Sequence, residues 1–253
     1  MKIIFHDKFY ESNYANDGAS VPGRMEAIIS TLQKQSEYSF VTPDPANEQH
    51  ILLAHTENYL NKIKTNKLLY EAALLSVGGA IKASEFAMGR AQAFACIRPP
   101  GHHAYRDFGW GYCHFCNMGI ALLNLRKRGQ IKSAFLLDFD AHTGDGTKDV
   151  LSDWKEVQIL NPMADNRVEY IKKIEEYIKT IDYVDMIAVC AGFDSYELDV
   201  GRKLKTFDFY NIGVLMKQLA KRMGHNRRFA VLEGGYYLPD LGKNVLAFCN
   251  GFE

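Results

Sequence analysis

The 253-residue sequence has no excess of charge of either sign, because 30 Lys and Arg residues are matched by 30 Asp and Glu residues. It also has no basic arm. The short basic run at residues 126–128 stands directly before Gly129 and is typical of positive charge at the end of a helix. Dedicated nucleic-acid-binding proteins usually carry a basic face, so we expect no nucleic-acid partner.

The sequence lacks long apolar runs. None approaches the length of a membrane span, and residues 1–5 are too few for the apolar core of a signal peptide. Cysteines are also few. Three of the five, Cys96, Cys190 and Cys249, lie among apolar residues, which is typical of a reducing compartment rather than of a disulfide-stabilised domain. These absences predict a cytoplasmic protein without a membrane partner.

The chain shows no linker-like stretch, low-complexity run or internal repeat. Hydrophobic residues make up 47% of it, which is enough for a sizeable core without disulfides. Cys113 and Cys116 have CxxC spacing, but the second pair that a structural zinc site normally needs is not nearby. We therefore expect one domain over residues 1–253.

Short apolar segments alternate with helix-like stretches after residue 90, which predicts a parallel sheet covered by helices. The fold class that we expect is α/β, with three αβα layers around a mostly parallel central sheet. The expected strands are residues 1–5, 39–41, 94–97, 134–137, 186–190 and 229–232. The expected helices are residues 24–35, 56–63, 68–88, 120–128, 167–181, 209–223 and a closing helix around 244–248.

Polar residues follow four of these strands at the point where each apolar segment ends. They are His102 and His103, then Asp138, Asp140 and His142, then Asp194, and finally Tyr236. In open parallel sheets, ligands bind beyond the carboxyl ends of the strands. The pattern therefore predicts a functional site at this edge of the sheet.

Asp138, Asp140 and His142 are spaced two residues apart, so in extended chain they point to the same side. Asp140 and His142 offer an oxygen and a nitrogen to a metal, and Asp194 offers a second oxygen. Two carboxylates and one imidazole leave coordination positions open, as a catalytic zinc requires. The same ligands suit other first-row divalent ions.

The tandem pair His102 and His103 is a candidate general base, since neutral imidazole with a carboxylate partner works near pH 7. Asp138 and Asp145 are the candidate partners. Tyr236 follows Gly234 and Gly235, where a flexible backbone brings a phenol close to a substrate. A phenol donates a hydrogen bond to a developing oxyanion.

Taken together, these motifs resemble the histone deacetylase family, which has the arginase/deacetylase fold. The resemblance is carried by RPPGHHA (98–104), GYC (111–113), DFDAHTGDGT (138–147), AGFDSYELD (191–199) and LEGGY (232–236). RPPGHHA and LEGGY are closer to class II and bacterial deacetylases or acetylpolyamine amidohydrolases than to class I.

The resemblance implies a single zinc ion on Asp140, His142 and Asp194. It implies that His102 and His103, supported by Asp138 and Asp145, move protons, and that Tyr236 polarises the carbonyl. On the substrate side it implies that Gly111 and Tyr112 form part of the acyl tunnel. It matches Arg24 to an arginine of the family's internal acetate cavity, and it implies a structural potassium ion near Asp138 and Asn161.

The sequence departs from the family pattern at several positions. Thr143 replaces the usual second histidine after the metal aspartate, and Cys116 stands where asparagine is common. The segment 60–69 is short and lysine-rich, whereas relatives carry a long rim loop there with an acid that grips the substrate. We therefore expect weak recognition of a peptide backbone.

The function that we expect is a zinc-dependent amidohydrolase that removes an acetyl or other acyl group from acyl-lysine or from a small acylated amine such as an acetylpolyamine. Two alternatives stay open. One is an arginase-like binuclear ureohydrolase, because Asp140-Ala141-His142 matches that family's Asp-Ala-His. The other is a non-catalytic protein that binds acyl groups. The sequence gives neither the natural substrate nor the oligomeric state.

Overall fold

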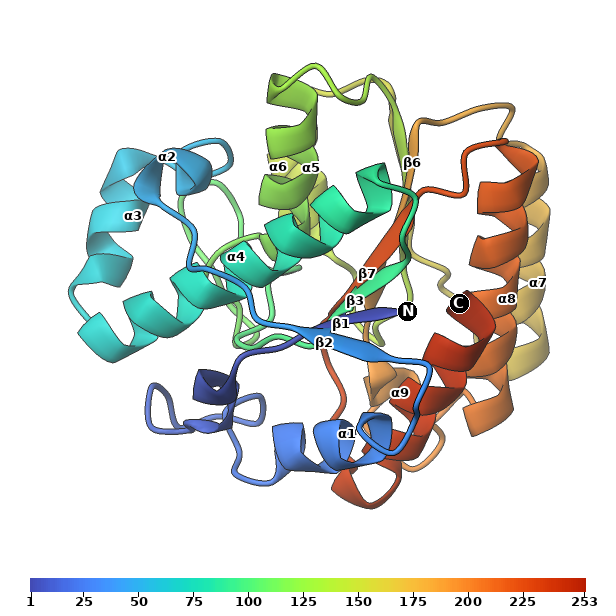
Figure 1. The fold of residues 1–253 in the computed structure, drawn as a ribbon, viewed down its shortest axis with the longest axis horizontal. Helices are drawn as coiled ribbons and strands as arrows, with labels where there is room; N and C mark the ends of the chain where they lie inside the picture. The colour runs from blue at the N-terminus through green and yellow to red at the C-terminus, as the bar shows by residue number, and fades with distance from the viewer.

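In the computed structural model, which describes all 253 residues, seven parallel strands form one sheet in the order β2-β1-β3-β7-β6-β4-β5 (Figure 1). The expected α/β class is confirmed, and the sheet is entirely rather than mostly parallel. The strands are β1 (Lys2–Ile4), β2 (Ser39–Val41), β3 (Ala93–Ala95), β4 (Ala134–Asp138), β5 (Val157–Leu160), β6 (Met186–Ala191) and β7 (Arg228–Leu232).

The four strands that carry the polar motifs, β3, β7, β6 and β4, are consecutive in the sheet. Every residue of each of them is buried, as expected for parallel strands with both faces covered. The sheet therefore brings their carboxyl ends together at one edge.

Helices cover both faces of the sheet (Figure 1). The long helix α4 packs on β1, β3 and β7 beside α5, while α8 packs on β6 and β7 beside α9, which also contacts α1. The helices are α1 (Arg24–Leu32), α2 (Glu48–Ile51), α3 (Glu57–Lys64), α4 (Lys67–Met88), α5 (Asn117–Lys127), α6 (Asp145–Val150), α7 (Arg167–Lys179), α8 (Thr206–Arg222) and α9 (Leu238–Phe252), with short 3₁₀ helices η1 (Asp7–Tyr10) and η2 (Phe193–Ser195).

Polar side chains fix where several helices begin. Thr56, Asn66 and Asn166 each accept a hydrogen bond from the backbone N–H three residues later, at the start of α3, α4 and α7. Such caps satisfy donors that the first helical turn leaves unpaired. Local sequence therefore determines where these helices begin, whereas burial of apolar residues determines which face of each helix packs on the core.

One continuous hydrophobic core of 74 buried residues runs from Ile3 to Phe252. It supports a single domain over residues 1–253, which stays a prediction.

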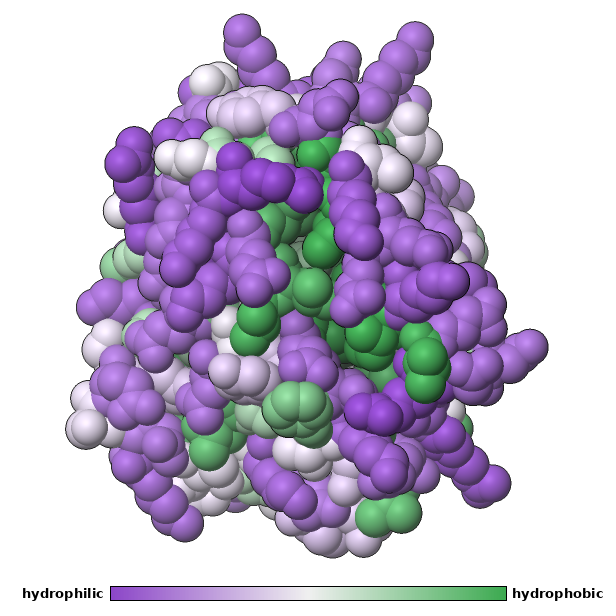
Figure 2. All heavy atoms as spheres, turned by 90° about the vertical axis from the view of Figure 1, so that its right-hand side faces the viewer, coloured by the Kyte–Doolittle hydropathy of each residue, from purple (hydrophilic) through white to green (hydrophobic).

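None of the helices is long and apolar enough to span a membrane. On the side shown in Figure 2, apolar side chains lie in a hollow between hydrophilic ones, and Ile178, Leu215 and Leu219 line a cavity of about 380 Å³ between α7 and α8.

The expected elements agree with the structure except at a few boundaries. Helix α1 ends at Leu32 rather than at residue 35, and α9 begins at Leu238, well before the expected closing helix at 244–248. The short elements β5, α2 and α6 and the two 3₁₀ helices were not predicted. Each has six residues or fewer, which is too short for a periodic pattern to stand out.

His55, which lies away from the strand ends, has a structural role. It is 5% exposed, its Nδ1 lies 2.8 Å from the carbonyl oxygen of Tyr105, and its Nε2 accepts a hydrogen bond of 2.9 Å from the N–H of Cys116. Both ring nitrogens therefore have a hydrogen-bond partner. Through them the neutral ring, just before α3, connects this part of the chain to the two ends of the loop that carries Trp110 and Tyr112.

This histidine should make stability depend on pH. Burial lowers the pKa of His55 to about 4, whereas an unfolded histidine titrates near 6.5. Above pH 6.5 the ring is neutral in both states; as the pH falls toward 4, only the unfolded chain gains the proton, so stability is lost. When the pH is lowered from 7.5 to 5, the unfolding free energy of the wild type should therefore fall. We predict that this fall is about 2 kcal/mol smaller in His55→Gln, which lacks the titrating ring. Urea unfolding at both pH values measures this, and equal losses would contradict it.

Candidate active site

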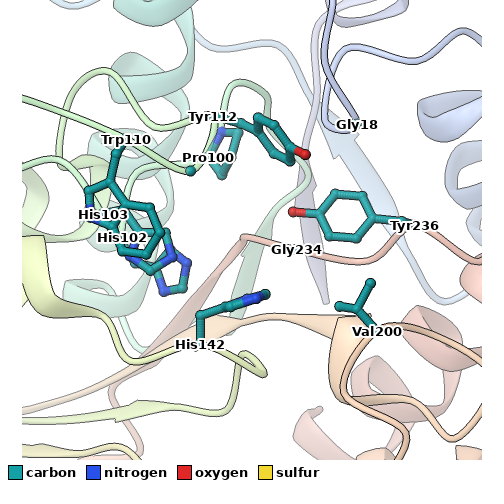
Figure 3. A pocket seen from close by; sticks show the side chains of 11 residues that line it. Gly18, Pro100, His102, His103, Trp110, Tyr112, His142, Val200, Gly234 and Tyr236 are labelled. Carbon is teal, nitrogen blue, oxygen red and sulfur yellow. The ribbon is translucent and has the colours of Figure 1, made fainter.

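A pocket of about 480 Å³ opens at the carboxyl edge of β3, β4, β6 and β7. In Figure 3, Trp110, His103 and His102 lie on one side of it, and Tyr236 and Val200 lie on the other. His142 forms its lower wall in this view. The structure therefore brings together the histidines and the tyrosine that the sequence placed at three separate strand ends.

Asp140, His142 and Asp194 form one cluster whose ligand atoms all lie within 4.8 Å of one another. His142 Nδ1 lies 3.0 Å from Asp140 Oδ1 and 3.1 Å from Asp194 Oδ2. Asp140 comes from the segment after β4, and Asp194 comes from η2, after β6. The predicted ligand set is thus convergent, with two oxygens and one nitrogen directed at one region.

Backbone N–H groups from neighbouring segments hold both carboxylates. Ala141 N–H donates to Asp194 Oδ1 over 3.0 Å, and Gly234 N–H donates to Asp140 Oδ2 over 2.9 Å. This approach requires glycine at 234, because a Cβ atom there would lie 2.6 Å from Asp140 Oδ2. The turn after β7 is therefore shaped around the carboxylate of Asp140.

The electrostatics of the cluster fit a bound cation. Asp140 and Asp194 are 5% and 0% exposed, and burial together with the charge of Asp140 raises the pKa of Asp194 to about 7. Asp194 Oδ2 makes no hydrogen bond although it is buried. Two buried like charges and an unsatisfied oxygen are costly without a positive partner, and the N/O donor set suits a divalent transition metal.

Each of the tandem histidines is paired with a carboxylate. His102 Nδ1 lies 3.1 Å from Asp138 Oδ2, and His103 Nδ1 lies 2.7 Å from Asp145 Oδ1. Burial disfavours the charged form of His102, but Asp140 and Asp138 together raise its pKa well above the usual range. Burial, followed by the charge of His102, lowers the pKa of His103. The pKa values of the two rings are therefore shifted in opposite directions.

Tyr236 and Tyr112 meet edge to face at the mouth of the pocket, with ring centroids 6.0 Å apart. The hydroxyl of Tyr236 points into the pocket (Figure 3), and burial raises the pKa of Tyr236. Its phenol is therefore a neutral hydrogen-bond donor at physiological pH. Tyr112 is 41% exposed, as expected of a wall near the entrance.

Trp110 is a pocket residue that sequence reasoning missed. Its indole stacks on the ring of His103, with centroids 4.0 Å apart and an interplanar angle of 32°, and it is 48% exposed. The segment lies close to His103 because Gly111 and Tyr112 both adopt left-handed backbone angles, with φ of 55° and 68°. A tyrosine in this region is strained, and no sequence signal marks that strain.

Arg24 does not line the pocket but lies behind it. It is fully buried, its Nε and Nη2 donate to the carbonyl oxygens of Gly235 and Glu233, and its guanidinium lies 5.7 Å from the ring centroid of Tyr236. Its Nη1 has no hydrogen-bond partner. Arg24 thus supports the turn that carries Tyr236, and its predicted contact with substrate stays a prediction.

The positions that depart from the family pattern lie around this site. Cys116 Sγ is 3.5 Å from the hydroxyl of Thr147, and Thr143 is half-buried. Asn161 donates to the carbonyl oxygen of Asp138 over 3.2 Å, beside the expected potassium site, which stays a prediction. None of the residues that line the pocket is acidic, in keeping with the shortened segment 60–69.

Comparisons with known proteins place this geometry in context. Residues 19–167 match the family model of the histone deacetylase domain. A probable deacetylase of Methanothermobacter thermautotrophicus is 26% identical over 99% of this chain and 90% of its own length. Acetylpolyamine amidohydrolase 2 of Pseudomonas aeruginosa is 28% identical over 67% of this chain and 58% of its own length. The crystal structure of the HDA15 HD domain has a TM-score of 0.84 at 19% identity, covering 99% of this chain and 88% of that one.

The carboxylate cluster generates a direct prediction about metal binding. Asp194→Asn keeps the side-chain volume but removes one of the two negative charges, so we expect the purified variant to lose most of the bound metal. We also expect it to lose the rise in melting temperature that zinc gives the wild type, since a ligand stabilises only the state that binds it. Elemental analysis and thermal melts measure both effects, and stoichiometric metal in the variant would remove Asp194 from the ligand set.

Proposed function

Because the chain belongs to the histone deacetylase domain family, we propose that it is a zinc-dependent deacetylase. The reaction is hydrolysis of the amide bond between an acetyl or other acyl group and an amine nitrogen. The observation that carries the proposal is the convergence on one pocket of a metal-ligand cluster, a histidine paired with a carboxylate, and a phenol.

We assign Asp140, His142 and Asp194 as the residues that hold the metal. When bound, zinc supplies a Lewis acid that polarises the substrate carbonyl and makes water more acidic. The half-exposed ring of His142 forms part of the pocket wall, so this cluster is open to substrate on that side. The buried carboxylates close the other side.

His103 acts as the general base in this proposal. Its Nδ1 is held by Asp145, which leaves Nε2 to accept a proton from the attacking water. The lowered pKa of His103 keeps the ring neutral and ready to accept that proton. His102, held by Asp138, assists this transfer. The proton on His103 then passes to the amine nitrogen as the carbon–nitrogen bond breaks.

Tyr236 completes the proposed site as a donor to the carbonyl oxygen. That oxygen gains negative charge in the transition state, and a neutral phenol directed into the pocket stabilises it there. The aromatic walls formed by Trp110 and Tyr112 exclude water from the apolar part of the substrate. The proposed site therefore stabilises the negative charge on the carbonyl oxygen at one end and shields the apolar part of the substrate from water at the other.

For the substrate, we propose an acylated amine, either acyl-lysine or a small molecule such as an acetylpolyamine. The name of the Pseudomonas aeruginosa relative supports the second possibility. The lack of an acidic residue in the pocket lining supports weak dependence on flanking peptide. Small acylated amines should then be hydrolysed about as well as acetyl-lysine peptides.

Turnover with and without a chelator tests the proposed function. The purified protein should release acetate from acetyl-lysine peptides or acetylpolyamines, lose this activity in chelator, and regain it with zinc. The same assay tests an acyl-binding protein without catalysis, which would bind these compounds without releasing acetate. Chelator-resistant turnover would contradict metal dependence.

We further predict the effect of removing the Tyr236 hydroxyl alone. Tyr236→Phe keeps the ring and its packing, so metal content and melting temperature should not change. Loss of a donor to an oxyanion typically lowers kcat by roughly 10²–10³-fold, and KM should move only a few-fold because the bond forms mainly in the transition state. Steady-state kinetics measure this, and an unchanged kcat would exclude Tyr236 from the reaction.

A further inference from the structure

Glu233 is a buried acid at the site that belongs neither to the metal cluster nor to the histidine–carboxylate pairs. It follows β7 directly, at the carboxyl edge of the sheet, and is 0% exposed. A buried carboxyl group is costly unless hydrogen bonds satisfy it. Its contacts therefore indicate what it does.

The side chain of Glu233 holds the backbone of the tandem-histidine segment. Its Oε2 accepts hydrogen bonds from the N–H of Gly101 over 2.7 Å and from the N–H of His102 over 3.1 Å. Both donors lie in the turn that delivers the two imidazoles from β3. Gly101 is tightly enclosed, since a Cβ atom there would lie 2.5 Å from the carbonyl oxygen of Phe115. The carboxyl group thus fixes a turn that has little space to move.

The backbone around Glu233 holds the metal cluster at the same time. The next residue, Gly234, donates to Asp140 Oδ2, and the carbonyl oxygen of Glu233 accepts from Arg24 Nη2 over 2.6 Å. Two consecutive residues after β7, Glu233 and Gly234, therefore connect the segment that carries the proposed general base to the segment that carries Asp140.

From this geometry we propose that Glu233 is a positioning residue. Its carboxyl group sets the place of His102 and His103 relative to Asp140, and through them it sets the rate of proton transfer. The proposal deepens the proposed function and rests on it. A purely structural role would give the same loss of stability but would leave the kinetics of the folded enzyme unchanged.

Two variants distinguish the effect of losing the hydrogen-bond acceptor at Glu233 from the effect of changing the size of its side chain. Glu233→Met keeps the length but leaves the two buried N–H groups without an acceptor, whereas E233Q keeps a carbonyl oxygen for them. In the folded, metal-loaded protein we expect Glu233→Met to lower kcat about tenfold or more, with KM changed less than about threefold. Complete loss of an acid–base group typically costs about 10²–10⁴-fold, and here the histidines are misplaced rather than removed. E233Q should recover most of that loss.

Asp185 offers a matched control. Its Oδ2 accepts from the N–H of Lys132 over 2.7 Å and from the N–H of Ser133 over 3.1 Å, which is the same pattern of two backbone bonds. It lies just before β6, at the opposite edge of the sheet from the pocket. Asp185→Leu should therefore lower the melting temperature and leave kcat unchanged.

Hydrogen exchange of the backbone amides of residues 101–104 provides a readout that does not depend on catalysis. We expect faster amide exchange in this segment for Glu233→Met and near-wild-type exchange for E233Q. If the wild type shows no turnover, the proposed function fails, and the exchange data still test the anchoring. Unchanged exchange, a kcat for Glu233→Met within threefold of the wild type, or E233Q as slow as Glu233→Met would each overturn the proposal.

Discussion

The structure of the site depends on one electrostatic constraint, the close approach of two buried carboxylates. Asp140 and Asp194 both lie near His142 Nδ1 and are nearly inaccessible to solvent. Such a pair is unfavourable unless donors and a cation compensate its charge. The surrounding backbone supplies donors from Ala141 and Gly234, while Asp194 Oδ2 is left with only the ion pair to His142 Nδ1.

The parallel sheet makes this arrangement possible. Strands β4, β6 and β7 are neighbours in register, so residues just beyond their ends meet without long connections. Asp194, after β6, accepts a bond from the segment after the adjacent strand β4, and Asp140, after β4, accepts one from the segment after β7, two strands away. The histidine turn after β3 is then held by Glu233, from the end of the adjacent strand β7.

The sequence allowed most of the fold to be predicted, and also which polar residues converge at its carboxyl edge, because strand ends are local features. Apolar runs that stop at Asp138 or Leu232 mark a strand and its site residue together. Trp110 could not be predicted in this way, since its stacking on His103 depends on strained backbone at Gly111 and Tyr112. The role of Glu233 was not predicted either, because its two bonds reach more than a hundred residues along the chain.

Strand β5 and helix α6 show a second limit of predicting structure from the sequence. The residues of β5 are only partly buried at the edge of the sheet, so their apolar pattern is diluted by polar neighbours. Helix α6 follows the metal segment and contains glycine and two aspartates within six residues, a composition typical of a turn. In both cases tertiary packing outweighs local propensity.

The central claim is that a single divalent metal ion neutralises the Asp140–Asp194 pair. Diffraction from crystals grown with zinc, recorded on both sides of the zinc absorption edge, tests it most directly. We predict one anomalous peak per chain, in contact with Asp140, His142 and Asp194. No peak at this cluster, or a peak only at the neighbouring group of His102, Cys113 and Glu233, would contradict the account.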